Sequence, residues 1–109
     1  MSLITLSEAQ AMVAQYHLQR SQILKEEHST DILPLSITFP KSEILDLLNQ
    51  DGAESCRIYF GMTGDENLIS LILVAADADG RDIALADENL IIDKGQRCPV
   101  NCPEISALY

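Results

Sequence analysis

The residues of this sequence best suited to chemistry are two cysteines near its C-terminal end. Cys98 and Cys102 lie four residues apart in the segment Cys-Pro-Val-Asn-Cys-Pro, and a proline follows each of them. Because proline disfavours helical backbone in the residue before it, the segment is not an ordinary helical turn. With three intervening residues instead of two, it also lacks the spacing of a thioredoxin-type redox pair.

Three states of these cysteines are open. A zinc site needs about four ligands, and only Cys56, His17 and His28 could add sulfur or nitrogen. A disulfide between Cys98 and Cys102 would close a very small ring, add little stability and be unusual in the cytoplasm. We expect the third state, in which reduced thiols lie in a tail whose path is fixed by its prolines.

An acidic segment invites a calcium interpretation. Asp77, Asp79 and Glu88 fall at the first, third and twelfth positions of an EF-hand loop that begins at Asp77. Its fifth position is Arg81, which cannot bind a cation, and its glycine comes at the fourth position instead of the sixth. We therefore expect a hairpin turn, in which aspartate and glycine supply the required backbone angles.

The two histidines do not form a joint site. His17 and His28 are three helical turns apart, which separates them by ~16 Å along a helix axis. Neither has a recognisable nucleophile partner, since the chain has no Gly-x-Ser-x-Gly segment and no protease signature around a cysteine. We expect surface or boundary histidines, and we assign no catalytic residue.

A strand that contains arginine offers a possible ligand face. Arg57 and Tyr59 share one side of this strand by alternation, with Ile58 and Phe60 on the other, and Arg81 opens a neighbouring strand. Arg57, Tyr59 and Arg81 could bind an anion. We expect instead that the arginines are solvated or pair with carboxylates such as Asp82 or Glu43, because acidic residues are abundant. The five glycines nowhere have the spacing of a phosphate-binding loop.

The periodicity of apolar residues defines the elements that must position these side chains. Spacings of three and four residues predict a long helix over 7–28 and a short one over 41–49. Strands are predicted over 35–39, 56–62, 68–75, 81–85 and 89–92, with the 68–75 strand central because it is apolar on both faces. Residues 95–109 read as an irregular tail. The prediction is a single α+β domain over 1–109, in which a small antiparallel sheet of three to five strands has both helices packed on one face.

Charge and length exclude several classes of function. The chain has 109 residues, 47% of them apolar, and a net charge of −10 without a cluster of Lys or Arg. Nucleic acid and anionic membrane surfaces would repel it, and no run approaches the ~20 apolar residues of a membrane span. With no signal peptide visible, we expect the cytoplasm, with export as the alternative if the natural N-terminus was trimmed. We expect no cofactor.

The strand Arg57-Ile58-Tyr59-Phe60-Gly61 and the tail Cys98-Pro99-Val100-Asn101-Cys102-Pro103 are the most specific parts of a pattern that covers about Phe39–Leu108. In this pattern the chain resembles a group of small bacterial proteins of the Bacteroidetes type that have no known function. Members often have a second proline where Val100 stands here. The resemblance implies a bacterial origin and transfers no functional residue.

Two classes of function are consistent with these features. We expect a non-enzymatic binding or protein-interaction module, because no catalytic constellation is complete. Its partner could be a protein or a small molecule, and a homodimer is among the open alternatives. A sheet face or an open edge strand would be its contact surface. The alternative is a small metal- or thiol-dependent enzyme or redox sensor that uses Cys98 and Cys102.

Overall fold

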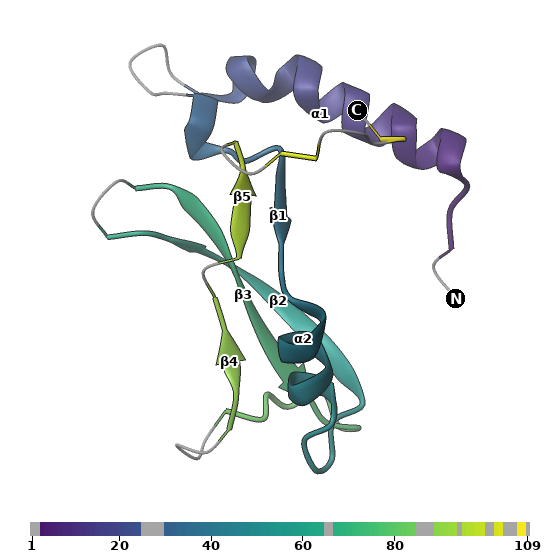
Figure 1. Ribbon diagram of the computed structural model, residues 1–109, viewed down its shortest axis with the longest axis vertical. Coiled ribbons are helices and arrows are strands. Elements are labelled where there is room, and N and C mark those ends of the chain that lie inside the picture. The colour runs from purple at the N-terminus through teal and green to yellow at the C-terminus, as the bar shows by residue number, and fades with distance from the viewer. Residues whose placement is uncertain are drawn as a thin grey trace.

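The computed structural model describes residues 3–24, 30–64, 67–84, 89–93, 95–99, 102–103 and 107–108. Within these residues it has two α-helices, one short 3₁₀ helix and two small antiparallel sheets (Figure 1). The predicted α+β class, with a long N-terminal helix and a second shorter one, is confirmed.

Helix α1 (Leu6–Ile23) begins directly after Thr5, which caps it. The Thr5 hydroxyl accepts a hydrogen bond from the Glu8 amide at 3.1 Å, which satisfies one of the free amides of the first turn. The helix ends at Ile23, because Leu24 is already extended. His28 and the end of the helix predicted over 7–28 lie outside the described residues.

The second helix, α2 (Lys41–Leu48), anchors the hydrophobic core. It starts directly after Pro40, and its Leu47 side chain is fully buried. Leu47 packs in one cluster with Leu73, Ala75 and Ile92, and Phe39 and Ile44 lie against that cluster. The core therefore occupies the space between α2 and one face of the larger sheet.

The larger sheet contains β2 (Ser55–Met62), β3 (Ile69–Ala76) and β4 (Ile91–Ile92), in the order β2-β3-β4. The strand predicted to be central, β3, is central here, and its second half from Leu73 to Ala76 is buried. The strand predicted over 81–85 is wrong for its described part. Asp82 makes only an isolated bridge with Ala76, while β4 pairs with Leu73 and Val74 in the place where that strand was expected.

The smaller sheet pairs β1 (Ser36–Thr38) with β5 (Gln96–Cys98), and Ser36 lies opposite Cys98. The expectation of a wholly irregular tail from residue 95 is wrong at these three residues. The pairing joins segments about 60 residues apart in sequence, and such a partner leaves no local pattern in a three-residue strand.

Helix α1 does not share the position of α2 on the sheet. It lies across the end of the molecule that holds β1 and β5, with α2 at the opposite end (Figure 1). None of its residues is buried, and its larger apolar side chains point in several directions, so that Met12, Leu18 and Ile23 are each about two-thirds exposed. Its attachment is therefore mainly polar.

Candidate functional site

The proposed anion-binding face is occupied by a carboxylate of the chain itself. The Arg57 guanidinium and the Tyr59 hydroxyl both donate to the carboxylate of Asp82, one to each oxygen. Strand β2 presents Arg57 and Tyr59 on one face, and the bridge between Ala76 and Asp82 brings the carboxylate to them. The expected pairing of Arg57 with Asp82 is confirmed.

The ionisation of these three groups is coupled. The hydrogen bond from Tyr59 is the main cause that holds the pKa of Asp82 below its ordinary value of 3.8. Burial opposes it, and the hydrogen bond and charge of Arg57 lower the pKa further. The bond to Asp82 raises the pKa of Tyr59 above 10.0 and that of Arg57 above its ordinary value. The cluster is therefore a charged pair with a neutral tyrosine at neutral pH, in which the Tyr59 hydroxyl and one guanidinium nitrogen of Arg57 are bound to Asp82.

The acidic turn uses its oxygens for its own backbone. One carboxylate oxygen of Asp77 accepts hydrogen bonds from the amides of Asp79 and Arg81, both at 2.9 Å. Gly80 has a φ of 80°, which favours glycine, and its amide bonds to the Asp77 carbonyl. Arg81 belongs to this turn through its backbone, and Glu88 lies outside the described residues. The described part of the chain holds no group of three or more His, Cys, Asp or Glu that could bind a metal ion.

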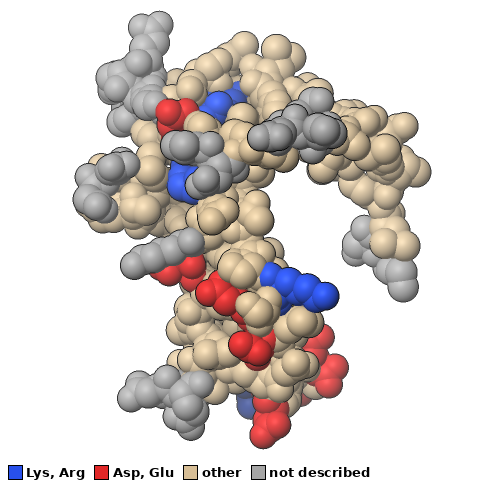
Figure 2. Space-filling view, viewed as in Figure 1, with Lys and Arg blue, Asp and Glu red and all other residues tan. Residues whose placement is uncertain are grey.

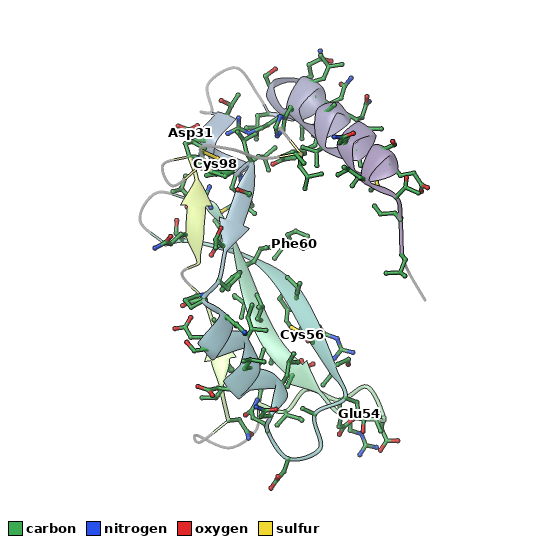
Figure 3. All side chains as sticks on the ribbon, turned by 45° about the vertical axis from the view of Figure 1, so that its right-hand side comes forward. Asp31, Glu54, Cys56, Phe60 and Cys98 are labelled. Carbon is green, nitrogen blue, oxygen red and sulfur yellow. A yellow bond between two sulfur atoms is a disulfide. The ribbon has the colours of Figure 1, made fainter. Side chains whose placement is uncertain are left out.

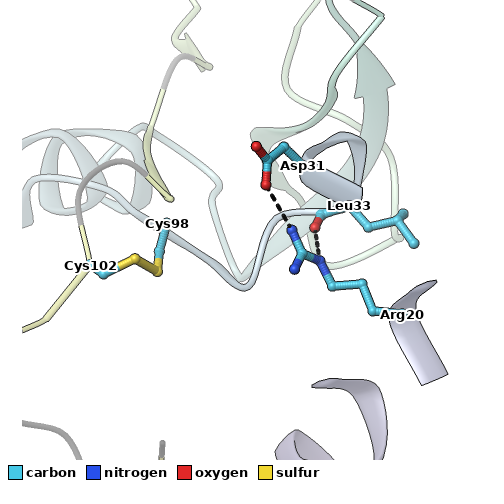
Figure 4. Close-up of a disulfide and its surroundings, with 5 residues drawn as sticks. All are labelled: Arg20, Asp31, Leu33, Cys98 and Cys102. Atoms are coloured by element: carbon cyan, nitrogen blue, oxygen red, sulfur yellow. Dashed lines mark hydrogen bonds and ion pairs between the residues drawn. A yellow bond between two sulfur atoms is a disulfide. The ribbon is translucent and has the colours of Figure 1, made fainter. Parts of the chain in front are cut away.

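The cysteines differ from the expected reduced state. Cys98 and Cys102 form a disulfide, with their Cα atoms 4.6 Å apart (Figure 4). Cys56 is an exposed free thiol on β2. Cys98 lies in β5, opposite Ser36 of β1, and is fully buried, whereas Cys102 is exposed. His17, the zinc ligand considered with them, lies in α1 beside Tyr16, at 6.3 Å between ring centroids.

The segment before β1 is held by side chains that bind its carbonyl groups. Arg20 of α1 donates to the Leu33 carbonyl and lies 3.4 Å from the Asp31 carboxylate (Figure 4). Tyr16 donates to the Pro34 carbonyl at 2.6 Å. Arg97 of β5 donates to the carbonyls of Asp31 and Ile69, which connects the smaller sheet to β3. These bonds give α1 and the two sheets their relative placement.

Strand β2 leaves an apolar row uncovered. Cys56, Ile58, Phe60 and Met62 alternate along it, and we call these four residues the β2 strip. Residues opposite each other in an antiparallel pair share a face, and Ile58 lies opposite Leu73 while Phe60 lies opposite Leu71. The β2 strip therefore continues the same face that α2 covers over β3 and β4.

Helix α2 does not cover the β2 strip. Phe60 is 81% exposed, Met62 58% and Ile58 52%. Figure 3 shows Phe60 projecting from β2 on the side where α1 lies, clear of α2. A groove of about 500 Å³ lies beside Phe60. It is lined mainly by apolar side chains from α1, the β1 segment and the larger sheet, including Tyr16, Leu35, Ile37, Phe60 and Leu71.

The β2 strip is also at the open edge of its sheet. No strand among the described residues pairs with the outer side of β2. The sequence assigned Ile58 and Phe60 to one face correctly but did not identify them as a contact surface. The signal was present in part, since an isoleucine, a phenylalanine and a methionine alternate there, but an edge position follows only from the topology.

Acidic side chains gather elsewhere on the surface. In Figure 2 they concentrate on the half of the visible face where α2 and β4 lie. Glu43 and Asp46 of α2 line a groove of about 340 Å³ together with Asp93, which follows β4. The apolar strip and the acidic groove are thus different parts of the surface.

No helix formed by the described residues is long and apolar enough to cross a membrane. In comparisons with known proteins, no family model, no curated protein and no solved structure matches the chain. The resemblance to small bacterial proteins therefore stays a prediction.

Proposed function

We propose that this chain is a non-enzymatic protein-interaction module whose contact surface is the β2 strip with the adjacent open edge of β2. The observation that carries the proposal is the exposure of Phe60, a large aromatic side chain, on an unpaired edge of an eight-residue strand. Open, apolar edge strands offer both backbone hydrogen-bonding groups and side-chain contact to an incoming chain.

Strand β2 lacks the features with which proteins usually block an edge. It contains no proline and no lysine, and its single charged residue, Arg57, is bound to Asp82 on the other face. The strand is also long compared with the two-residue β4 at the opposite edge. Its outer edge is therefore the best site in the sheet for strand addition.

The strip is large enough to matter energetically. A fully buried apolar side chain contributes about 1.5–3 kcal/mol. The exposed fractions of Ile58, Phe60 and Met62 then correspond to about 3–6 kcal/mol in gross terms if a partner covers them. Backbone hydrogen bonds along the edge add to this gain, and the two together offset the entropic cost of association.

The polar groups that could suggest an enzyme support the non-enzymatic proposal instead. Asp82 is held by Arg57 and Tyr59, and Asp77 closes its own turn. These hydrogen bonds tie both carboxylates to groups of the chain itself and stabilise the backbone around β2 and β3.

Photo-crosslinking tests the proposal. A photoreactive amino acid replaces Phe60 in the full chain, and a matched variant carries it at Ser42, an exposed position of α2. In the cells that naturally produce the protein, we expect position 60 to form a discrete crosslinked adduct with a protein partner, and position 42 to form none. Equal labelling from both positions, or no adduct from position 60, would contradict the proposal.

The disulfide favours a second candidate, a redox-sensitive structural element. An external thiolate could attack the exposed Cys102 sulfur, which would release Cys98 as a thiolate, and a second thiol of the same reductant would complete the reduction. Because Cys98 is fully buried, its thiolate would form away from water, and this disfavours rapid exchange. We therefore rank the redox sensor second.

The disulfide also supports an oxidising compartment, the alternative to the cytoplasm. Alkylation of thiols in intact cells before lysis tests this location. Labelling of Cys56 without Cys102 would support it, and labelling of both exposed cysteines would favour the cytoplasm.

A further inference from the structure

We propose that the partner at the β2 edge is a second copy of this chain, so that two β2 strands pair antiparallel around a two-fold axis. This inference rests on the interaction function proposed above. Three properties of the described structure support it: the excess surface area, the symmetry of the edge and the distribution of charge.

The chain exposes more surface than a folded monomer of its mass. Its accessible surface is 8208 Å² and its mass is 12.0 kDa. A compact monomer of this mass exposes about 6,000 Å², which leaves an excess of about 2,200 Å². A standard interface buries about 800 Å² on each partner, and an obligate dimer buries more. The excess is therefore sufficient for a stable dimer.

The shape gives the same result. The radius of gyration is 15.9 Å, whereas a compact chain of this length has about 13 Å. Helix α1 lies away from the sheet and β2 lies bare, so apolar surface that a compact monomer would cover remains open (Figure 1). A partner that covers the β2 strip would remove the most apolar part of this excess.

Two copies of β2 are complementary by symmetry. A two-fold axis perpendicular to the sheet makes the two strands antiparallel, and it keeps the covered face of both sheets on one side. The result is one continuous six-stranded sheet in which the two β2 strips lie side by side. Phe60 and Ile58 of one copy then meet the same residues of the other, which buries the aromatic ring near the centre of the interface.

Charge distribution selects this surface for self-association. Each copy carries a net charge of −10, so most pairs of surfaces would repel. Strand β2 carries no carboxylate, and its arginine is already neutralised by Asp82. In contrast, the groove beside α2 is lined by Glu43, Asp46 and Asp93. Two copies can therefore approach through β2 with little electrostatic cost.

The mass of the purified full chain in solution tests the inference, measured by light scattering together with X-ray scattering. We expect twice the 12.0 kDa mass, with dissociation on dilution. Phe60→Lys places a cation at the centre of the interface and should raise the dimer dissociation constant at least about tenfold. The matched control is Ile91→Lys on the short opposite edge strand, where the side chain is 58% exposed, and it should remain dimeric.

Circular dichroism separates a lost dimer from a lost fold, because Phe60→Lys alters an exposed side chain and should keep the wild-type spectrum. If the spectrum of Phe60→Lys differs from that of the wild type, the test uses hydrogen exchange of the wild-type protein instead of the variant. Amides of β2 should then exchange more slowly as the protein concentration rises, and unchanged exchange overturns the inference.

The remaining outcomes distinguish this inference from the interaction function. A monomer with a radius of gyration near 15.9 Å overturns the homodimer, while adducts from position 60 would still support a different partner. A monomer near about 13 Å means that α1 covers the strip within one chain, and it overturns both proposals. A dimer disrupted by Ile91→Lys but not by Phe60→Lys overturns the assignment to β2.

Discussion

The contrast between Leu47 and Phe60 is the most direct test of where this chain keeps its core. Both are large apolar residues in predicted elements, but Leu47 is fully buried and Phe60 is 81% exposed. We compare Leu47→Ala with Phe60→Thr, because threonine preserves strand propensity while it removes the ring. The two variants should differ severalfold in their effect on the free energy of unfolding.

The structure sets both magnitudes. Replacing a buried leucine by alanine costs about 2–5 kcal/mol, and a value near 3 kcal/mol corresponds to a fall of about 12–24 °C in Tm for a domain of this size. A buried phenylalanine would cost about 3–5 kcal/mol, but only about a fifth of Phe60 is covered. Phe60→Thr should therefore cost below about 1 kcal/mol in the monomer.

Urea unfolding followed by circular dichroism measures both effects, at a low and a high protein concentration. If β2 is an interface, the cost of Phe60→Thr should grow with concentration, because the wild type gains stability from association and the variant does not. The cost of Leu47→Ala should remain large at both concentrations. Equal costs for the two variants at the low concentration would show that the monomer itself buries Phe60, and the reasoning would fail.

Three further predictions concern the polar and covalent contacts. Cys102→Ser opens the disulfide and should lower the free energy of unfolding by about 2 kcal/mol, because the bond restricts the loop entropy of the unfolded chain. Reductant should have the same effect on the wild type, and Cys56→Ser is the control. An unchanged free energy of unfolding in Cys102→Ser would refute the role of the bond. The lowered pKa of Asp82 adds stability that is present above about pH 4 and lost as the pH falls through the folded value. Asp82→Asn should therefore lower Tm at neutral pH and converge with the wild type in acid, whereas parallel Tm curves would contradict this. Arg97→Met removes the donor to the carbonyls of residues 31 and 69 and should cost about 1–3 kcal/mol, with faster hydrogen exchange around β5. Unchanged exchange would count against this connection.

Local patterns identified most of the secondary structure. The helix over 41–49 and the strands over 56–62 and 68–75 appear within one or two residues of their predicted bounds. These elements are bounded by strong signals, such as Pro40 before the helix and the Asp77–Gly80 turn after the strand. The strand predicted over 81–85 was wrong for its described part, because alternation over so few residues does not decide strand pairing, and only one isolated bridge forms there, between Asp82 and Ala76.

The candidate site was predictable only in part. Alternation placed Arg57 and Tyr59 on one face, and the excess of acid suggested Asp82 as a partner of Arg57, which the structure confirms. The disulfide could not be chosen from spacing, because its formation depends on β5 pairing with β1, a contact between distant segments. The exposure of Phe60 could not be predicted from the sequence either, because the same residue in a central strand would be buried.

The sequence by itself determined the α+β class, the acidic surface and the main helices and strands, because propensity, periodicity and charge act over a few residues. The tertiary structure decided which strand became an edge, which apolar residues stayed bare and which cysteines met. Those outcomes depend on the order of strands in the sheet and on the position of α1, and both are set by the sum of contacts between segments far apart in the chain.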